Sequence, residues 1–360
     1  MKVAIYKTYL DKKSPSLEIY AKILEYNKIN FKYVNIHQPG FWDSITTSDL
    51  FIFKWANEDN DHILAEALFP VLEESLKINL FPDLNTCWHY DDKIKQYYLL
   101  LKSGTPVVPT HVFWDKKSAL EWLPTANFPL VFKLTTGASS SNVVLVKTLS
   151  HANKLTLRMF GKGIMPGHVS GIYHQLKTLN FNWKAILNYY LRKIYRTIAN
   201  KDEVLWRKHK NYIMFQDFLD GNDFDTRVTT IGTRVHAFRR FVRKNDFRAS
   251  GAETWDINPD KIDKRMLKIA LDTSKQLGFQ SMAYDFIYDA NKNPLIVEIS
   301  YSFGQPGYPD FMNGYWDENL NWIEGRFWPH YFELKDALKK DDLVCPLLEI
   351  PPEWKKNSII

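Results

Sequence analysis

The sequence predicts a protein of the α/β class that folds as more than one lobe. Strand-like and helix-like segments alternate through the first 90 residues, which is typical of a layered α/β sheet. Further strand-like segments and one helix follow between residues 211 and 300 and end in a hairpin. A chain of 360 residues is long for one domain, and its 45% apolar and 24% charged residues are ordinary for a globular protein.

In the N-terminal domain, residues 1–90, strands are expected where β-branched and aromatic residues cluster, and helices where apolar residues recur at helical spacing. The expected strands are residues 2–6, 31–36 and 49–55, and the expected helices are residues 16–27 and 60–77. The rest of the chain is expected to form a larger domain, residues 91–345, and a C-terminal tail, residues 346–360.

A helix is expected directly after residue 90. Either Asp91 or Asp92 can cap its first turn, and Gly104 can end it. Its apolar positions, which recur at helical spacing, are Ile94, Tyr97, Tyr98 and Leu101. The later expected elements are strands at 129–134, 143–147, 211–219, 224–231 and 235–242, and a helix at 260–278 that leads into the last hairpin.

Several classes of protein are excluded by composition and motif. Only Cys87 and Cys345 occur, so neither a disulfide framework nor a cysteine-based zinc site is expected. The start "MKVAIYKTYL" lacks the long apolar run of a signal peptide, and no segment has the length of a membrane span, so a cytoplasmic protein is expected. No Ser–His–Asp order, nucleophile elbow or Walker A sequence is visible.

The positive charge is concentrated in one segment. Residues 151–210 contain 12 Lys and Arg against two acids, a net charge of +10, whereas the whole chain carries +6 and the other 300 residues therefore carry −4. The basic character thus belongs to one element. No nucleic-acid module is recognisable, so nucleic acid is not expected as a partner.

The hairpin "AYDFIYDANKNPLIVEIS" carries two acids inside apolar strands. If Asp289 pairs with Pro294 across a four-residue loop, the same register puts Asp285 opposite Glu298, and Ser300 points to the same face. Two carboxylates so close repel each other, so a positive partner is needed. A hard divalent cation such as Mg²⁺ is the economical one.

A loop of small residues at 135–142 follows an apolar strand that contains Lys133. Gly137 and its Ser and Thr neighbours can bring backbone N–H groups and hydroxyls close to a phosphate. A lysine in an apolar strand needs an anion, which favours this interpretation. The alternatives are an ordinary hairpin loop, and a lysine whose side chain reaches solvent from a sheet edge.

Two further strands offer groups for a nucleotide. Gln216 and Phe218 share a face just before the chain breaks at Gly221, where backbone groups can meet an adenine edge. In the next strand Asp225 and Arg227 share a face. Guanidinium groups suit bidentate contact with phosphate oxygens, and the arginines of this region are Arg227, Arg239, Arg240, Arg243 and Arg248. Surface ion pairs on a solvated face are the alternative, favoured for Arg240 and Arg243.

The order of these features resembles the ATP-grasp superfamily, in particular its ribosomal-protein glutamate ligases and glutathione synthetases. The resemblance covers roughly residues 80–305, and residues 1–80 suit the pre-ATP-grasp domain that precedes it. The ordered motifs are Asn85, Asp92-Lys93, Gly104-Thr-Pro106, Pro109-Thr110, Lys133, Gln216-Asp-Phe218, Asp225-Thr-Arg227, Arg248 with Ser250-Gly251, Asp285, and Glu298-Ile-Ser300.

The resemblance implies ATP and Mg²⁺ as cofactors and a role for each matching residue. Arg227 and Arg248 would steady the γ-phosphate and an acyl-phosphate, and Asp285, Glu298 and Ser300 would hold Mg²⁺. The residues expected to contact ATP are Lys93, Lys133, Thr136, Gly137, Ser139, Ser140, Ser141, Gln216, Phe218, Leu219 and, near the ribose, Asp225. Residues 136–141 would form the flap over the phosphates.

The chain departs from the family pattern at two positions. Ser300 stands where the family has asparagine in its metal motif, and Ser250 stands where the arginine loop has asparagine. A hydroxyl is a weaker oxygen ligand than an amide. The number of metal ions is therefore open.

The activity that the resemblance implies is carboxylate–amine ligation through an acyl-phosphate. The protein would act by positioning and by electrostatic stabilisation of the transferring phosphoryl group. Two alternatives stay open: phosphorylation of a hydroxyl, as in ATP-grasp kinases, and binding of a nucleotide or polyanion without turnover.

The basic segment 151–210 looks like a helical insertion into the family fold. Its aromatic and aliphatic residues lie at helical spacing among lysines and arginines, which is typical of an element that faces a polyanion or a membrane surface. Such an element would guide a glycan, for example one that bears uronic acids, or a lipid-linked acceptor, and would allow peripheral contact with the inner face of a membrane. The aromatic tail resembles those of ATP-grasp proteins of surface-polysaccharide synthesis. Ordinary packing of an amphipathic helix is the alternative.

Overall fold

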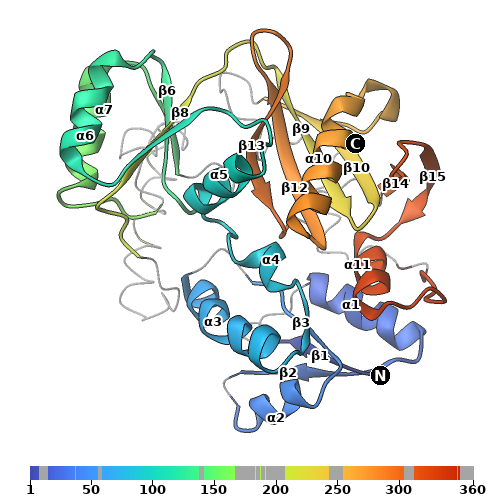
Figure 1. Ribbon diagram of the computed structural model, residues 1–360. Helices are drawn as coiled ribbons and strands as arrows, with labels where there is room; N and C mark the ends of the chain where they lie inside the picture. Colours follow the sequence, from blue (N-terminus) through green and yellow to red (C-terminus); the bar gives the residue numbers. More distant parts are fainter. Residues whose placement is uncertain are drawn as a thin grey trace.

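The computed structural model describes residues 1–7, 15–36, 38–55, 59–137, 142–166, 207–242, 254–303, 312–346 and 348, together with positions 183, 187 and 191. In these residues the chain forms three lobes, each built on its own β-sheet, so the predicted α/β class is confirmed (Figure 1). The N-terminal sheet is parallel, and the central and C-terminal sheets are antiparallel. None of the helices described is long and apolar enough to cross a membrane.

The N-terminal lobe is a parallel sheet with the strand order β2-β1-β3-β4. Its strands are β1 (Lys2–Tyr6), β2 (Asn30–Val34), β3 (Leu50–Ile52) and β4 (Asn79–Phe81). Its helices are α1 (Pro15–Tyr26), α2 (Phe41–Thr46), α3 (Asp59–Pro70), the π-helical turn η1 (Val71–Ser75) and α4 (Leu84–Cys87). The predicted alternation of strands and helices in this part of the chain is confirmed.

Both faces of the N-terminal sheet are covered, which is why β1 is apolar at successive positions. Tyr6 packs with Phe69 of α3 on one face, and Ile5 packs on the other face in a cluster with Leu334 of α11 (Pro329–Leu338). Although α11 comes from the far end of the chain, it lies beside α1 in this lobe (Figure 1).

The central lobe is an antiparallel sheet with the order β5-β8-β6-β7. Its strands are β5 (Thr110–Phe113), β6 (Leu130–Lys133), β7 (Val143–Val146) and β8 (Ile213–Asp217), and its helical segments are α6 (Lys116–Trp122), η2 (Leu123–Thr125) and α7 (Leu149–Met159). Ala119 of α6 and Met159 of α7 share a core with Phe132 and Phe215 of the sheet.

The start of the basic segment belongs to this core. Leu155 and Met159 of α7 are buried in it, so ordinary packing accounts for residues 151–159. Most of the proposed insertion lies outside the described residues. Of the residues after 166 in this segment, the structure describes Trp183, Leu187 and Leu191, which are helical and have exposed side chains, and residues 207–210.

The C-terminal lobe is an antiparallel sheet with the order β13-β12-β9-β10-β14-β15, and β11 pairs with β10. Its strands are β9 (Phe224–Ile231), β10 (Arg234–Phe241), β11 (Trp255–Asp256), β12 (Ser281–Tyr288), β13 (Pro294–Ser300), β14 (Met312–Trp316) and β15 (Trp322–Phe327). Its helical segments are η3 (Pro259–Lys261) and α10 (Lys264–Leu277). Tyr284 packs with Met266 of α10, whereas Asp285, the next residue of β12, faces the opposite side.

The hairpin of β12 and β13 differs from the predicted register at its turn. Tyr288, not Asp289, pairs with Pro294, and a β-bulge after Asp285 shifts the register by one residue. Phe286 pairs with Ile296 and Asp285 pairs with Glu298, so the facing carboxylates are confirmed although the predicted turn is wrong. Because side chains alternate between the two faces of a strand, the extra residue puts Glu298 on the same face as Asp285.

The connection between the lobes runs along the edge strand β13. The N–H of Val108 donates to the carbonyl of Ile296 at 3.0 Å, and the N–H of Ile296 donates to the carbonyl of Pro106 at 2.9 Å. The preceding helix α5 (Lys93–Lys102) lies beside β13, between the central and C-terminal lobes (Figure 1). Its first residue, Lys93, therefore reaches Glu298.

Candidate active site

Two arginines neutralise Asp285 on its face of the C-terminal sheet. Arg227, its direct neighbour on β9, donates from Nε and Nη2 to the two carboxylate oxygens at 2.7 and 2.8 Å. Nη2 of Arg240 lies 2.8 Å from Asp285 Oδ2. Burial alone would raise the pKa of Asp285, but the two guanidinium groups hold it well below its usual range.

Arg240 is buried, so the prediction of a solvated surface ion pair is wrong for this residue. Its side chain is 7% exposed and donates from Nε and Nη2 to the two oxygens of Asp225, both at 2.7 Å. Asp225, predicted to lie near a ribose, thus contacts Arg240. Arg243 and Arg248 lie outside the described residues.

Glu298 is held by a lysine from another lobe. Lys93 Nζ lies 3.2 Å from Glu298 Oε1 and 3.6 Å from Asp91 Oδ1, and it donates to the carbonyl of Gly137 at 3.2 Å. The Lys93 side chain is 6% exposed, whereas that of Glu298 is 33% exposed. Burial alone would lower the pKa of Lys93, but Glu298 and Asp91 together raise it, so the ammonium stays charged.

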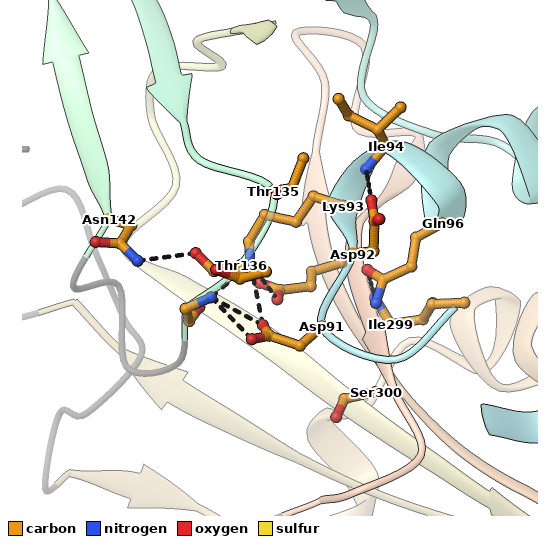
Figure 2. Close-up of polar contacts among 12 residues, drawn as sticks. Asp91, Asp92, Lys93, Ile94, Gln96, Thr135, Thr136, Asn142, Ile299 and Ser300 are labelled. Atoms are coloured by element: carbon orange, nitrogen blue, oxygen red, sulfur yellow. Dashed lines mark hydrogen bonds and ion pairs between the residues drawn. The ribbon is translucent and has the colours of Figure 1, made fainter. Parts of the chain in front are cut away.

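The two acids at the start of α5 point to different partners, as Figure 2 shows. Asp92 is the helix cap, because its Oδ1 accepts from the N–H groups of Ile94 and Lys95, each at 3.1 Å. Asp91 instead accepts from the N–H of Gly137, at 3.0 Å to Oδ1 and 2.9 Å to Oδ2. The helix predicted after residue 90 is confirmed, and Asp92 is the residue that caps it.

The described part of the expected flap, Thr136 and Gly137, is fixed by its backbone and by two side chains. Gly137 has a φ of +124°, and the Asn142 side chain donates to the carbonyl of Thr136 at 2.8 Å. A Cβ at Gly137 would come within 2.2 Å of Asn142 Nδ2, so only glycine fits there. Ser139, Ser140 and Ser141 lie outside the described residues.

Lys133 is buried, so the alternative that its side chain reaches solvent from a sheet edge is wrong. It is 6% exposed, and its Nζ donates to Gln216 Oε1 at 2.6 Å. Gln216 in turn donates from Nε2 to Thr110 Oγ1 at 3.1 Å. Burial lowers the pKa of Lys133 to about 8, unlike that of Lys93 in the same cleft.

A cleft between the central and C-terminal sheets brings four of the predicted residues together. Its empty volume, open solvent included, is about 340 Å³. The predicted residues that line it are Lys93, Lys133, Gln216 and Glu298. Lys93 and Glu298 meet in it, and most of the remaining wall is apolar, a combination typical of a small-molecule site. Phe218 and Leu219 are half-buried and are not among the residues that line this cleft.

Most of the apolar wall of the cleft was not predicted from the sequence. It is formed by Tyr97, Leu100, Val107, Val108, Met214, Ile296 and Val297. The helical spacing on α5 was the available signal, but it favoured Tyr98 and Leu101, whose side chains are 47% and 48% exposed. Spacing alone does not tell a packing face from a face that lines a cleft.

A second, larger pocket is lined by Asp91. Its empty volume, open solvent included, is about 750 Å³, and one wall comes from α3 and the start of α5. The pocket is also lined by Arg207, Lys208 and Lys210, whose side chains are exposed and have no ion-pair partner among the described residues. Asp91 and Lys93 therefore stand between the two pockets.

Of the two facing carboxylates, Glu298 is available to a magnesium ion, whereas Asp285 is already occupied by Arg227. Mg²⁺ is usually held by one or two carboxylates together with substrate phosphates, and the described residues contain no cluster of three or more His, Cys, Asp or Glu. Glu298 is partly exposed and can take this role, but both oxygens of Asp285 already accept from Arg227. Ser300 is half-buried and donates to the carbonyl of Ser302 at 3.2 Å.

Comparison with known proteins gives one family match and distant relatives. Residues 194–311 match the model of the RimK-like ATP-grasp domain. The chain is 21% identical over 305 residues to the α-aminoadipate–LysW ligase LysX of Saccharolobus solfataricus, covering 83% of this chain and 91% of that protein. The LysX of Sulfurisphaera tokodaii is 23% identical over 248 residues, covering 69% and 70%. The crystal structure of the D-cycloserine synthetase DcsG is similar in fold, with a TM-score of 0.53, 15% identity, and coverage of 94% and 99%.

Proposed function

Because the chain belongs to the ATP-grasp superfamily of carboxylate–amine ligases, we propose that it uses Mg²⁺ and ATP to join a carboxylate to an amine through an acyl-phosphate. The observation that carries the proposal is the meeting of Lys93, Lys133 and Glu298 in a cleft whose remaining wall is mostly apolar. A nucleotide needs both environments, one for its base and one for its phosphates.

The residues of the cleft divide between the two ends of the nucleotide. The apolar wall, with Gln216 at its margin, suits the adenine, and Lys93 and Lys133 suit the phosphates. Asp285, Glu298 and Ser300 would hold Mg²⁺, which adds positive charge beside the phosphate oxygens. Arg227 is next to this group and can turn from Asp285 to a phosphate. Arg248 and the flap serines keep the phosphate-binding roles that the resemblance implies.

The reaction requires little covalent chemistry from the protein. A substrate carboxylate oxygen bonds to the γ-phosphorus while the bond between that phosphorus and the β–γ bridging oxygen breaks, which releases ADP. The amine nitrogen then bonds to the acyl carbon, inorganic phosphate leaves and the nitrogen loses a proton. Lys93, Lys133 and Arg227 supply positive charge where negative charge spreads during the first step.

The second pocket is our candidate for the acceptor site, because it meets the nucleotide cleft at Asp91 and Lys93. Four acids and four cations line the pocket, and three of the cations, Arg207, Lys208 and Lys210, lie at the end of the basic segment, where they would meet an anionic acceptor. A glycan that bears uronic acids, free or lipid-linked, has that chemistry, which would give the enzyme a place in surface-polysaccharide synthesis and peripheral contact with a membrane.

Trapping with hydroxylamine tests the proposed chemistry. The protein is incubated with ATP, Mg²⁺ and pooled carboxylates, and hydroxamate and ADP are measured, with E298Q as the inactive control. Hydroxamate supports the acyl-phosphate route. A phosphorylated acceptor without free phosphate would identify a kinase instead, and nucleotide binding without turnover would favour a protein that only binds.

Charge reversal tests the acceptor pocket. K208E/K210E should raise the KM for an anionic acceptor at least about tenfold, because each reversal replaces attraction by repulsion. The KM for ATP should stay within about twofold. K116E/K117E, on the surface of α6, makes the same change in net charge away from the pocket and is the matched control. Equal effects of the two double variants would exclude this pocket.

A further inference from the structure

Asp91 connects two parts of the proposed nucleotide site that come from different segments of the chain. Both of its oxygens accept from the N–H of Gly137, at 3.0 and 2.9 Å, and Oδ1 lies 3.6 Å from Lys93 Nζ. Its side chain is 3% exposed. A buried carboxylate is costly unless hydrogen bonds and positive charge compensate it. The Lys93 ammonium and the Gly137 amide do so in part, and burial still raises the pKa of Asp91 to about 6.

The backbone at Asp91 is strained in a way that aims this side chain. Asp91 has a φ of +49°, in the left-handed region that residues other than glycine seldom adopt, whereas Asp92 is extended and caps α5. The reversal between them sends two successive acids in different directions (Figure 2). Such strain persists where the surroundings fix the conformation.

The two buried lysines of the cleft differ in their carboxylate partners. Lys93 contacts Asp91 and Glu298, and together they keep its ammonium charged. Lys133 has no carboxylate within ion-pair distance among the described residues, and its amine donates to Gln216 instead. If Glu298 turns to a metal ion, Asp91 is the carboxylate that stays with Lys93.

We propose that Asp91 is a positioning residue for the nucleotide, which holds the Lys93 ammonium and the Gly137 amide side by side where they meet the phosphates. The inference rests on the proposed function, because it requires phosphates at this end of the cleft. Asp91 acts through Lys93 and Gly137 and does not itself touch the nucleotide. Asp91 lines the acceptor pocket and contacts Lys93, which lines the nucleotide cleft, so this ion pair marks the boundary between the two.

Calorimetric titration with adenylyl imidodiphosphate and Mg²⁺ tests this role. Asp91→Asn keeps the shape and tolerates the left-handed backbone but removes the charge, and it should weaken binding about tenfold or more. Asp92→Asn, the same change one residue away, keeps a good helix cap and should change binding less than about twofold. Adenosine, which lacks phosphates, should bind wild type and Asp91→Asn equally.

A second variant and a double-mutant cycle separate positioning from simple structural support. Asp91→Gly removes the carboxylate but suits the left-handed backbone, so it should melt no lower than Asp91→Asn and lose as much affinity. Asp91→Asn should also have a much smaller effect in a Lys93→Met background, because the two residues act together.

Three outcomes would overturn the inference while nucleotide binding by the wild type stands. The first is equal affinity of Asp91→Asn and wild type for the ATP analogue. The second is tighter binding by Asp91→Asn, which would make Asp91 a competitor of the phosphates. The third is a loss of affinity for adenosine as large as the loss for the ATP analogue. A wild type that binds no nucleotide would overturn the proposed function itself.

Discussion

Asp285 and Glu298 face each other directly across β12 and β13, yet each carboxylate has cations of its own. Asp285 is bound by Arg227 and Arg240, and Glu298 is bound by Lys93. The charge balance expected from a metal ion is thus met by side chains. A magnesium ion that joins this pair must displace Arg227 from Asp285, and the displaced guanidinium is then free to meet a phosphate.

Glu298→Gln should separate metal binding from stability. Because Glu298 is one third exposed, its ion pair adds little to folding, and the free energy of unfolding should change by less than about 1 kcal/mol. The Mg²⁺-dependent gain in affinity for an ATP analogue should disappear, as calorimetry with and without Mg²⁺ can measure. A variant that keeps this gain would remove Glu298 from the metal site.

Asp285→Asn should be unstable as well as inactive. The carboxylate compensates two buried guanidinium groups, so removing its charge should lower the free energy of unfolding by about 3 kcal/mol. Urea unfolding beside Glu298→Gln is the measurement. Equal stability of the two variants would contradict the ion network described here.

Loss of Arg240 should mainly reduce stability, whereas loss of Arg227 should mainly reduce turnover. Arg240→Met leaves Asp225 and Asp285 without the cation they share and should lower the free energy of unfolding by about 3 to 5 kcal/mol. Arg227→Met leaves Asp285 with Arg240 and should lower it less, while turnover falls more than a hundredfold, the size of effect seen when one electrostatic group of an active site is removed. The reverse order of stabilities would contradict these roles.

Lys133 should make nucleotide binding sensitive to pH. Burial lowers its pKa to about 8, so the ammonium is lost as the pH rises through 8 and binding of an ATP analogue should weaken there. Lys133→Arg stays charged and should lose this step, whereas the pKa of Lys93 is raised and adds none. A step of equal size in Lys133→Arg would assign it to another group.

The ligand-free protein should become more stable as the pH rises above 8, whereas nucleotide binding weakens. Between about pH 8 and the ordinary lysine pKa near 10.4, the unfolded chain holds a proton on Lys133 that the folded protein has lost. Lys133 therefore makes the folded state more stable as the pH rises through this window. The difference between wild type and Lys133→Met in urea unfolding, measured at several pH values, isolates this contribution.

Gly137 should not tolerate a side chain. Gly137→Ala meets Asn142 Nδ2 at 2.2 Å in addition to the unfavourable φ, so it should disturb the turn and weaken nucleotide binding. Gly221→Ala is the control, because Gly221 also has a positive φ but nothing lies within 4 Å of its added Cβ. Thermal unfolding and calorimetry of both variants should show the larger loss at Gly137.

Local patterns predicted much of what the site contains. Alternation along a strand puts Asp225 with Arg227 on one face, and a capping acid followed by apolar spacing predicts α5. The turn of the last hairpin could not be predicted, because the register depends on the position of a β-bulge, and no local motif marks that position. The faces of α5 were also ambiguous, since lining a cleft and packing in a core use the same apolar residues.

The sequence alone determined which chemistries this protein can hold: lysines, arginines and carboxylates lie inside otherwise apolar strands, where charge must be compensated. Only the tertiary structure decided which charge meets which, because Lys93, Arg227, Arg240 and Glu298 lie on four separate elements. Ion pairing depends on distance in space, and the lobes that bring these side chains within 4 Å are set by the packing of the whole chain.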